Sequence, residues 1–185
     1  PGAGLYVAAA AAAFALSAVE EIHAVAFRDP LTGLPARRAL ETALARLSAP
    51  YVGALLDIDH FKRFNDTFGH AVGDQVLTMV AVRLAQAGSA QAFRYGGEEF
   101  TLLLPGRTLA EAIPVLEAAR AAIEATTFTL RAPDRPRRRP AKGKARTPAR
   151  AEVVAVTVSI GAATPAQGDQ PAMVLQAADQ ALYRA

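Results

Sequence analysis

The stretch QAFRYGGEEFTLLL, residues 91–104, consists of two strand-like runs separated by two glycines and two glutamates. Residues 91–95 and 99–104 are rich in the aromatic and apolar side chains found in strands. A Gly-Gly pair supplies the positive φ angles that two-residue hairpin turns require. The stretch therefore predicts a β-hairpin with a two-residue turn at Gly96 and Gly97, followed at once by Glu98 and Glu99.

Hydrophobic periodicity places the other elements around this hairpin. Apolar residues at helical spacing predict helices over residues 36–48, 73–88, 108–125 and 173–185. Thr108 is the expected N-cap of the third helix, and Pro114 is a potential kink within it. Short apolar runs predict further strands at 51–58, 128–130 and 151–164. This order of elements around one sheet predicts an α+β fold, with a central, mainly antiparallel sheet flanked by helices.

The composition of the chain limits the kinds of protein to which it can belong. A chain of 185 residues that is 52% apolar can form one compact domain with a sizeable core. The absence of cysteine excludes disulfides, thiolate metal sites and cysteine nucleophiles. Residues 131–150 hold nine Lys and Arg against one acid, Asp134, which leaves 11 basic and 16 acidic residues elsewhere. The net charge of +3 is therefore due to one segment.

That segment lacks apolar periodicity and is rich in proline and arginine, so we expect a basic, disordered insertion at about 132–150. Two interpretations remain open for it: a solvated insertion without a partner, and contact with anionic lipid headgroups or nucleic acid.

The start of the chain also differs from the rest. Residues 2–19 form an uncharged run of 18 residues, about the shortest length that spans a bilayer. The run is mostly alanine, and neither an initiator Met nor a basic residue precedes it, which argues against an intact signal peptide and for a piece of a longer chain. We expect residues 1–27 to be an N-terminal apolar helix, either the end of a membrane span or a soluble connecting helix, ahead of a domain at 28–185.

Acidic residues gather where the predicted strands end. Asp57 closes the strand at 51–58, and Glu98 and Glu99 follow the hairpin turn. If these strands are neighbours, the carboxylates meet at one edge of the sheet, where a divalent cation would relieve their repulsion. Oxygen ligands without His or Cys suit Mg²⁺ or Mn²⁺. Ordinary solvated turn acids are the alternative, and Asp59 and Asp66 are interpreted first as loop-stabilising acids.

The polar segment 57–74, DIDHFKRFNDTFGHAVGD, is expected to form a loop, and it contains side chains that suit a nucleotide. Asn65 and Asp74 offer the donor and acceptor pattern that recognises a guanine edge, and Lys62 with nearby backbone N–H groups could hold phosphates. His70 is either a substrate contact or, as is more usual before a helix, a capping or packing residue.

Five blocks of the sequence together resemble the GGDEF domain, the catalytic domain of diguanylate cyclases. They are DPLTGLPARR (29–38), DIDHFKRFNDTFGHAVGD (57–74), RYGGEEF (94–100), VTVSIGAAT (156–164) and ADQALYRA (178–185). The resemblance implies a fold similar to nucleotidyl cyclases and polymerase palms. It also implies the Mg²⁺- or Mn²⁺-dependent condensation of two GTP into cyclic di-GMP and two pyrophosphates.

The resemblance further implies a role for each matching position. The metal ligands would be Asp57, the backbone carbonyl of Ile58, Glu98 and, as a further ligand, Glu99. Glu98 would also be the catalytic residue that accepts a proton. The substrate contacts would be Asn65 and Asp74 on guanine, His70 lining the site, Lys62 with the backbone of His60 and Phe61 on phosphates, and Gly97, whose missing side chain lets the nucleotide approach.

Assembly and regulation follow from the same resemblance. One site of this kind holds one GTP, so turnover would require a homodimer with two facing sites. Ala87 and Ala90 stand where product-inhibited members carry Arg-x-x-Asp, so that inhibitory site should be absent. We expect a cytoplasmic domain, anchored to the inner membrane of a bacterium through the N-terminal segment, with no nucleic acid partner. The alternative function is a silent domain that binds GTP or cyclic di-GMP as a regulatory module.

Overall fold

The computed structural model describes residues 6, 14, 27–130, 152–166 and 170–184. Five helices and six strands lie within these ranges. The helices are α2 (Arg37–Leu44), α3 (Phe61–Phe68), α4 (His70–Ala85), α5 (Leu109–Glu124) and α6 (Pro171–Leu182). The strands are β1 (Tyr51–Ile58), β2 (Gln91–Arg94), β3 (Glu99–Pro105), β4 (Phe128–Leu130), β5 (Glu152–Val154) and β6 (Val158–Ala163).

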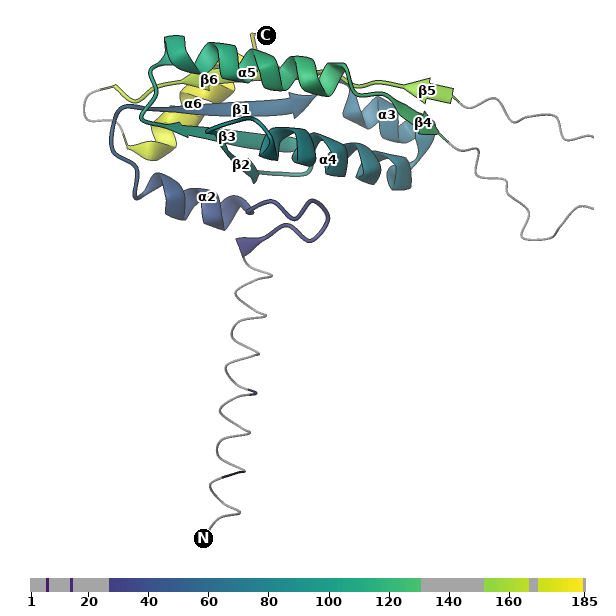
Figure 1. The fold of residues 1–185 in the computed structure, drawn as a ribbon, viewed down its shortest axis with the longest axis horizontal. Helices are drawn as coiled ribbons and strands as arrows, with labels where there is room; N and C mark the ends of the chain where they lie inside the picture. Colours follow the sequence, from purple (N-terminus) through teal and green to yellow (C-terminus); the bar gives the residue numbers. More distant parts are fainter. Residues whose placement is uncertain (1–5, 7–13, 15–26, 131–151, 167–169, 185) are drawn as a thin grey trace, which may run out of the picture.

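A four-stranded antiparallel sheet forms the centre of the domain, in the order β2-β3-β1-β6 (Figure 1). Successive side chains of β1 point to opposite faces. Val52, Ala54, Leu56 and Ile58 join a core with α4 and α5, whereas Tyr51 joins a second core with α2 and α6. The α+β class and the helix-flanked antiparallel sheet are therefore confirmed.

The prediction of a single sheet is wrong. The run at 151–164 divides into β5 and β6, and β5 pairs with β4 in a separate two-stranded ribbon. The division follows from the length of β1, which ends at Ile58 opposite Val158. Residues before Val158 have no strand of the central sheet beside them, so the chain pairs with β4 instead.

Helix α3 lies in the segment that the sequence predicted to be a loop. Phe61, Phe64 and Phe68 have helical spacing; the ring of Phe64 stacks with that of Phe61 and lies tilted against that of Phe68. This apolar pattern was present in the sequence, but the polar residues between the rings obscured it. The neighbouring helix accordingly begins at His70 rather than at residue 73.

The hairpin is confirmed, but its two-residue turn is wrong. Four residues, 95–98, lie between β2 and β3, and the backbone N–H groups of Tyr95 and Gly96 both donate to the carbonyl of Glu99, at 2.9 and 3.2 Å. Neither Gly96 nor Gly97 has a φ angle in the left-handed region. A wider turn does not need positive φ angles, so backbone conformation does not explain the two glycines. The space that they leave at the candidate site explains them instead.

Helix α5 starts as predicted. The hydroxyl of Thr108 accepts from the backbone N–H of Glu111, and the Glu111 carboxylate accepts from the backbone N–H of Thr108 at 2.9 Å, which forms a capping box. The helix continues through Pro114 to Glu124.

Two predicted segments lie outside the described residues. These are the basic insertion and, apart from the exposed helical residues Tyr6 and Phe14, the apolar N-terminal run. Among the residues that are described, no helix combines the length and the apolarity needed to cross a bilayer.

Helix α6 rests directly on the backbone of β6 at Gly161. A Cβ atom at this position would overlap the backbone of α6, including the carbonyl of Ala178 and the Cα atom of Leu182 at 2.6 Å. Only a residue without a side chain permits this approach, so position 161 sets the distance between the helix and the sheet.

We expect Gly161→Ala to lower the free energy of unfolding by about 3 kcal/mol, because α6 must move away from the sheet. In thermal unfolding this corresponds to a fall in Tm of roughly 6–12 °C. Gly97→Ala is the matched control, since its Cβ would meet no atom within 4 Å. Equal Tm values for the two variants would contradict the close packing of α6.

Candidate functional site

The sheet brings the predicted acidic residues together at one edge. Asp57 pairs with Glu99 across β1 and β3, and Glu98 is the last residue of the turn. Paired residues of adjacent strands place their side chains on the same face. Asp57 and Glu98 are half-buried and Glu99 is exposed. The condition set by the sequence, that the two strands are neighbours, is therefore met.

Asp57 is the electrostatic centre of this edge. Its burial, and then the nearby charges of Glu98, Glu99 and Asp59, raise the pKa of Asp57 from 3.8 to about 6. Within the described ranges, no hydrogen bond or ion pair holds the carboxylates of Asp57, Glu98 or Glu99. The edge therefore carries an uncompensated negative charge.

A pocket of about 420 Å³ opens beside these acids. Two acids of the sheet edge form one wall and the end of α6 forms the other. The lining residues are Asp57, Glu99, Asp179, Gln180, Leu182, Tyr183 and Arg184.

The backbone of Ile58 is directed toward the same turn. In an antiparallel ladder, alternate residues of a strand direct their N–H and C=O groups to opposite neighbours. The carbonyl of Glu99 faces β2, so the backbone groups of the next residue, Phe100, face β1 and bond to its partner Leu56. Ile58 lies two residues after Leu56, so its backbone N–H and C=O groups also face the β3 side. The ladder ends at Asp57 and Glu99, so the carbonyl of Ile58 has no partner strand.

These oxygens fit a hard divalent cation. The carboxylates of Asp57 and Glu98 and the free carbonyl of Ile58 are oxygen ligands of the kind that Mg²⁺ takes when substrate phosphates complete its coordination. No group of three His, Asp or Glu side chains at ligand distances is found among the described residues.

Asp59 has a structural role, as its first interpretation held. Its carboxylate accepts from the hydroxyl of Thr157 at 2.5 Å and from that of Ser159 at 2.8 Å, which fastens the start of β6 to the end of β1. The next residue, His60, adopts a left-handed backbone with φ of 57° and begins α3. Asp66 is exposed.

Asn65 carries a buried acceptor without a partner. Its Oδ1 atom is shielded from solvent and has no hydrogen bond. It lies against Gly73 of α4, where a Cβ atom would overlap it. A buried, unpaired carbonyl costs about 1–3 kcal/mol. An incoming donor, such as the N–H edge of a base, would remove this cost.

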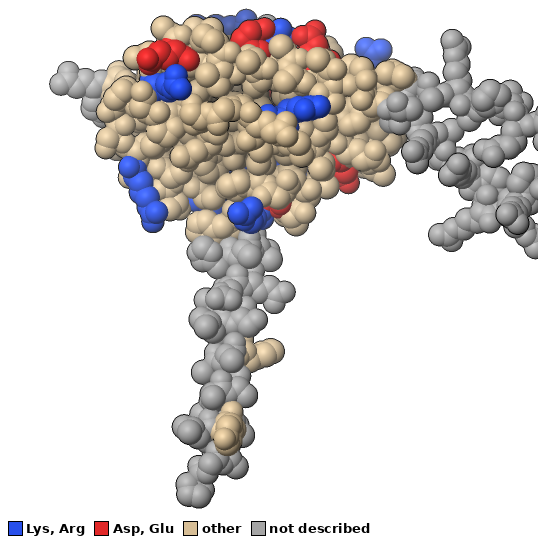
Figure 2. Space-filling view, viewed as in Figure 1, with Lys and Arg blue, Asp and Glu red and all other residues tan. Residues whose placement is uncertain are grey.

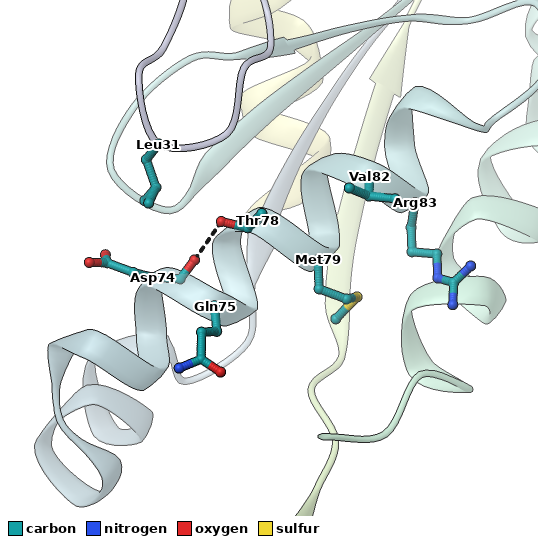
Figure 3. Close-up of a pocket in the computed structure, with 7 residues that line it drawn as sticks. All are labelled: Leu31, Asp74, Gln75, Thr78, Met79, Val82 and Arg83. Atoms are coloured by element: carbon teal, nitrogen blue, oxygen red, sulfur yellow. Dashed lines mark hydrogen bonds between the residues drawn. The ribbon is translucent and has the colours of Figure 1, made fainter. Parts of the chain in front are cut away.

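Asp74 follows Gly73 on α4, so the contact between α3 and α4 places it beside Asn65. Figure 3 shows its side chain directed away from the helix axis, while its backbone carbonyl accepts from the hydroxyl of Thr78 at 2.8 Å. Leu31 lies above the helix at this point. A pocket of about 490 Å³ runs from Leu31 and Asp74 along α4 to Arg83.

The remaining predicted contacts surround the start of α3 and α4. Lys62 and His70 are exposed, and His70 is the first residue of α4. In α3 the first intrahelical donor is the N–H of Phe64, which bonds to the carbonyl of His60. The N–H groups of Phe61 and Lys62 therefore have no intrahelical acceptor, which is the arrangement that binds anions.

Sequence reasoning missed Arg94, which holds the turn in place. Its guanidinium donates to the carbonyls of Gly96 and Gly97, at 3.2 and 2.7 Å, and to Oδ1 of Asp29 at 2.7 Å. Burial alone would raise the pKa of Asp29, but hydrogen bonds from Thr32 and Arg94 outweigh it and lower the pKa. The available signal was an arginine two residues before Gly96, within a block already singled out.

Gly96 and Gly97 have different roles in this turn. A Cβ on Gly96 would approach the carboxylate of Glu99 to 2.5 Å, so glycine leaves room for that carboxylate in its present position. A Cβ on Gly97 would point into open space, and the turn is therefore accessible there.

Comparisons with known proteins agree with this geometry. The family model for the diguanylate cyclase GGDEF domain matches residues 26–185. The chain is 40% identical over 171 residues to response regulator PleD of Caulobacter vibrioides, covering 87% of this chain and 34% of that protein. It is 39% identical over 178 residues to diguanylate cyclase DgcP of Pseudomonas aeruginosa, covering 91% of this chain and 24% of that protein. The chain thus spans about a third or less of these relatives.

Among solved structures, the coiled coil and GGDEF domain of DgcB from Caulobacter crescentus, in complex with c-di-GMP, superposes with a TM-score of 0.81. Sequence identity is 30%, with 98% of this chain and 91% of that chain covered. The GGDEF domain of DgcB alone gives a TM-score of 0.71 at 33% identity, covering 86% of each chain.

The raised pKa of Asp57 predicts how stability depends on pH. The folded protein binds this proton more tightly than the unfolded chain, so the stabilisation is complete below about pH 4 and is lost as the pH rises through 6. Asp57→Asn cannot ionise, so we expect its Tm in EDTA to exceed that of the parent at pH 7.5 and this advantage to vanish at pH 4.

Asp66→Asn is the control for this experiment. Because Asp66 is exposed on α3 and is not among the charges that raise the pKa of Asp57, the Tm of its variant should stay close to that of the parent at both pH values. An Asp57→Asn protein that is less stable than the parent at pH 7.5 would show that the acidic edge is not strained.

Proposed function

Because the chain belongs to the diguanylate cyclase GGDEF domain family, we propose that it condenses two GTP molecules into cyclic di-GMP with release of two pyrophosphates. The observation that carries the proposal is the acidic edge, where Asp57, Glu98 and Glu99 lie together and the pKa of Asp57 is raised. Such an edge is destabilising in the free protein and becomes favourable when it binds a positively charged centre. A metal–nucleotide complex provides that centre.

Each residue of the edge has a part in the proposed reaction. Asp57, the carbonyl of Ile58 and Glu98, with Glu99 as a further ligand, would hold Mg²⁺ or Mn²⁺. The chemistry that such a metal would supply is neutralisation of triphosphate charge and a more acidic ribose 3′-hydroxyl. Glu98 accepts the proton of that hydroxyl as its oxygen bonds to the α-phosphorus of the facing GTP. The bond between the α-phosphorus and the bridging oxygen breaks, and pyrophosphate leaves with the electron pair.

Recognition of the base rests on the two helices beside the edge. The unpaired acceptor of Asn65 and the carboxylate of Asp74 suit the N–H donors on the edge of guanine. The free N–H groups at the start of α3, with Lys62, suit the phosphates, and His70 borders the same space. Gly97 leaves room for the nucleotide beside the turn.

The proposed reaction requires two copies of the domain, because each site holds one GTP and the product contains two new bonds. We propose that a two-fold homodimer brings the turns of two copies face to face. Any connection that holds two copies together would favour this pairing by raising the local concentration of one domain near the other.

Weak product inhibition is part of the same proposal. Ala87 and Ala90, at the positions of the family's inhibitory Arg-x-x-Asp, are half-buried and pack against the main core. Their methyl groups offer neither charge nor hydrogen bond to a phosphate.

We expect Glu98→Gln to lower cyclic di-GMP synthesis by about 10²–10⁴-fold, since it removes the proton acceptor and a metal ligand without changing side-chain volume. Product formed from GTP and Mg²⁺ is measured by mass spectrometry at a saturating protein concentration. Glu124→Gln, an exposed surface change, should retain parent activity. A parent protein that binds GTP but forms no cyclic di-GMP would instead favour the regulatory module.

We expect Asn65→Ala to reduce the preference for GTP over ATP by roughly tenfold or more. The Asn65 amide would pair with guanine and would be left without a hydrogen-bond partner when adenine is bound, which disfavours ATP. The ratio of kcat/KM for the two nucleotides measures this effect. Gln75→Ala removes an exposed amide of α4 and should leave the ratio unchanged. An unaltered ratio in Asn65→Ala would remove Asn65 from the base site.

A further inference from the structure

The glycine at position 73 is not explained by the conformation of the backbone. Gly73 is a buried residue in the first part of α4, and its φ angle does not lie in the left-handed region. Inside a helix, glycine is less favourable than any residue except proline, because it loses the most backbone freedom on folding. The reason for a glycine at this position must therefore lie in what it contacts.

The space that Gly73 leaves is occupied by the side chain of Asn65. A Cβ atom on Gly73 would overlap Oδ1 of Asn65 and would lie 3.0 Å from its Cγ atom. Turning the carboxamide over would not relieve this overlap, because Nδ2 would then take the place of Oδ1. The carboxamide can keep its position only while residue 73 has no side chain.

The backbone on both sides of this contact is held by hydrogen bonds. The carbonyl of Asn65 accepts from the N–H of Gly69 at 2.8 Å, and the carbonyl of Gly69 accepts from the N–H of Gly73 at 3.2 Å. Phe61, one turn before Asn65 in α3, is buried, and its Cζ atom would lie 3.2 Å from a Cβ atom on Gly73. Because the carboxamide is the free end of a flexible side chain, we expect a methyl group at position 73 to move the carboxamide rather than the helices.

Two features of this contact lower the stability of the free protein. Oδ1 of Asn65 is buried without a hydrogen-bond partner, and Gly73 weakens the helix. An alanine at position 73 would remove both features, because it would strengthen α4 and move the carboxamide toward solvent. Features that lower stability, and that a single methyl group would correct, are typical of functional positions.

The carboxamide lies where base recognition is proposed. Asp74 directly follows Gly73, so the residue that makes room for Asn65 is bonded to the other proposed contact with guanine. Guanine and adenine are both uncharged. A preference between them must therefore come from directed hydrogen bonds, and not from the charged side chains scattered over the face that α4 and α5 form (Figures 1 and 2). Such bonds depend on the direction in which the carboxamide points.

We propose that Gly73 is a positioning residue for the choice of base, a role that rests on the proposed function. Gly73 acts through Asn65 and not by contact with the nucleotide. Its missing side chain lets Asn65 lie against α4, with Oδ1 sheltered from water and available to a donor of the guanine edge. With a larger residue at position 73 the carboxamide turns into water, where competition from solvent removes most of the difference between guanine and adenine.

The test is a cycle of four proteins: the parent, Gly73→Ala, Asn65→Ala and the double variant. The probes are GDP and ADP with Mg²⁺, which carry the same phosphates and differ in the base, and calorimetry gives the Kd of each. We expect Gly73→Ala to lower the preference for GDP over ADP by roughly tenfold or more, as Asn65→Ala does. In the double variant the second change should have no further effect, because the carboxamide is already absent.

Further measurements separate positioning from a general loss of structure. In cyclic di-GMP synthesis, Gly73→Ala should raise KM for GTP roughly tenfold and leave kcat within about twofold of the parent, because the base contact is the same in the ground state and the transition state. The NMR signal of the Asn65 side-chain amide should move toward that of a solvated asparagine. The Tm of Gly73→Ala should equal or exceed that of the parent, and the double variant should unfold roughly 2–4 °C above Asn65→Ala, because alanine strengthens α4.

Gln75→Ala is the matched control, because it places an alanine at an exposed position of the same helix and should leave the base preference unchanged. A Gly73→Ala protein with the parent's preference would overturn the inference. A further loss of preference in the double variant would also overturn it, since Gly73 would then act by a route other than Asn65. If Gly73→Ala does not fold, the double variant should fold, and an equally unstable double variant would show that the carboxamide is not the displaced group.

The outcomes also distinguish this inference from the proposed function. A parent protein that binds GDP and ADP equally would overturn the base site that the proposed function assigns, and this inference with it. A parent protein that prefers GDP and forms cyclic di-GMP, while Gly73→Ala keeps the same preference, would overturn the inference alone.

Discussion

The guanidinium of Arg94 is the contact on which the arrangement of the site depends. It holds the carbonyls of Gly96 and Gly97 on one side and the carboxylate of Asp29 on the other, with side chains only 14% and 17% exposed for the arginine and the aspartate. A bidentate or forked arginine fixes orientation as well as distance. The direction in which the turn presents Glu98 is therefore tied to the segment that opens the domain.

The same interaction explains why the two ends of the sheet behave differently. The chain around Asp29 must lie beside β2 for its carboxylate to reach Arg94, and in doing so it covers the β2 edge. No comparable contact draws a described segment to β6. Within the part of the chain that the structure describes, the β2 edge is thus the one that a segment outside the sheet covers.

Local patterns in the sequence predicted the parts of this structure that depend on neighbouring residues. The hairpin, the N-cap at Thr108 and the strand at 51–58 that carries Asp57 near its end follow from side chains close together in the chain. The separate ribbon of β4 and β5 did not follow, because it depends on where a distant strand ends. The turn geometry was wrong for a related reason: glycines admit several turn types, and a side chain outside the turn, Arg94, stabilises the one adopted.

The site divides in the same way. Spacing alone indicated that Asp57 could meet Glu99, but the unpaired carbonyl of Ile58 emerges only from the ladder register. The buried acceptor of Asn65 depends on its contact with Gly73 across two helices, one of which the sequence did not predict. Carboxylates that repel one another and polar atoms without a hydrogen-bond partner both occur in this region. They lower the stability of the fold and leave these groups available to a ligand.

The contact between α6 and Gly161 has a consequence for the dimensions of the site. The end of α6 forms one wall of the pocket beside Asp57 and Glu99, and the backbone of β6 supports that wall without an intervening side chain. Because the side chain of Gly161 is a single hydrogen atom, α6 approaches β6 closely, and this distance sets the width of the space beside the acids. Strand β6 itself contributes no residue to that pocket. Selection for a pocket of this width would act on a position that carries no chemical group at all.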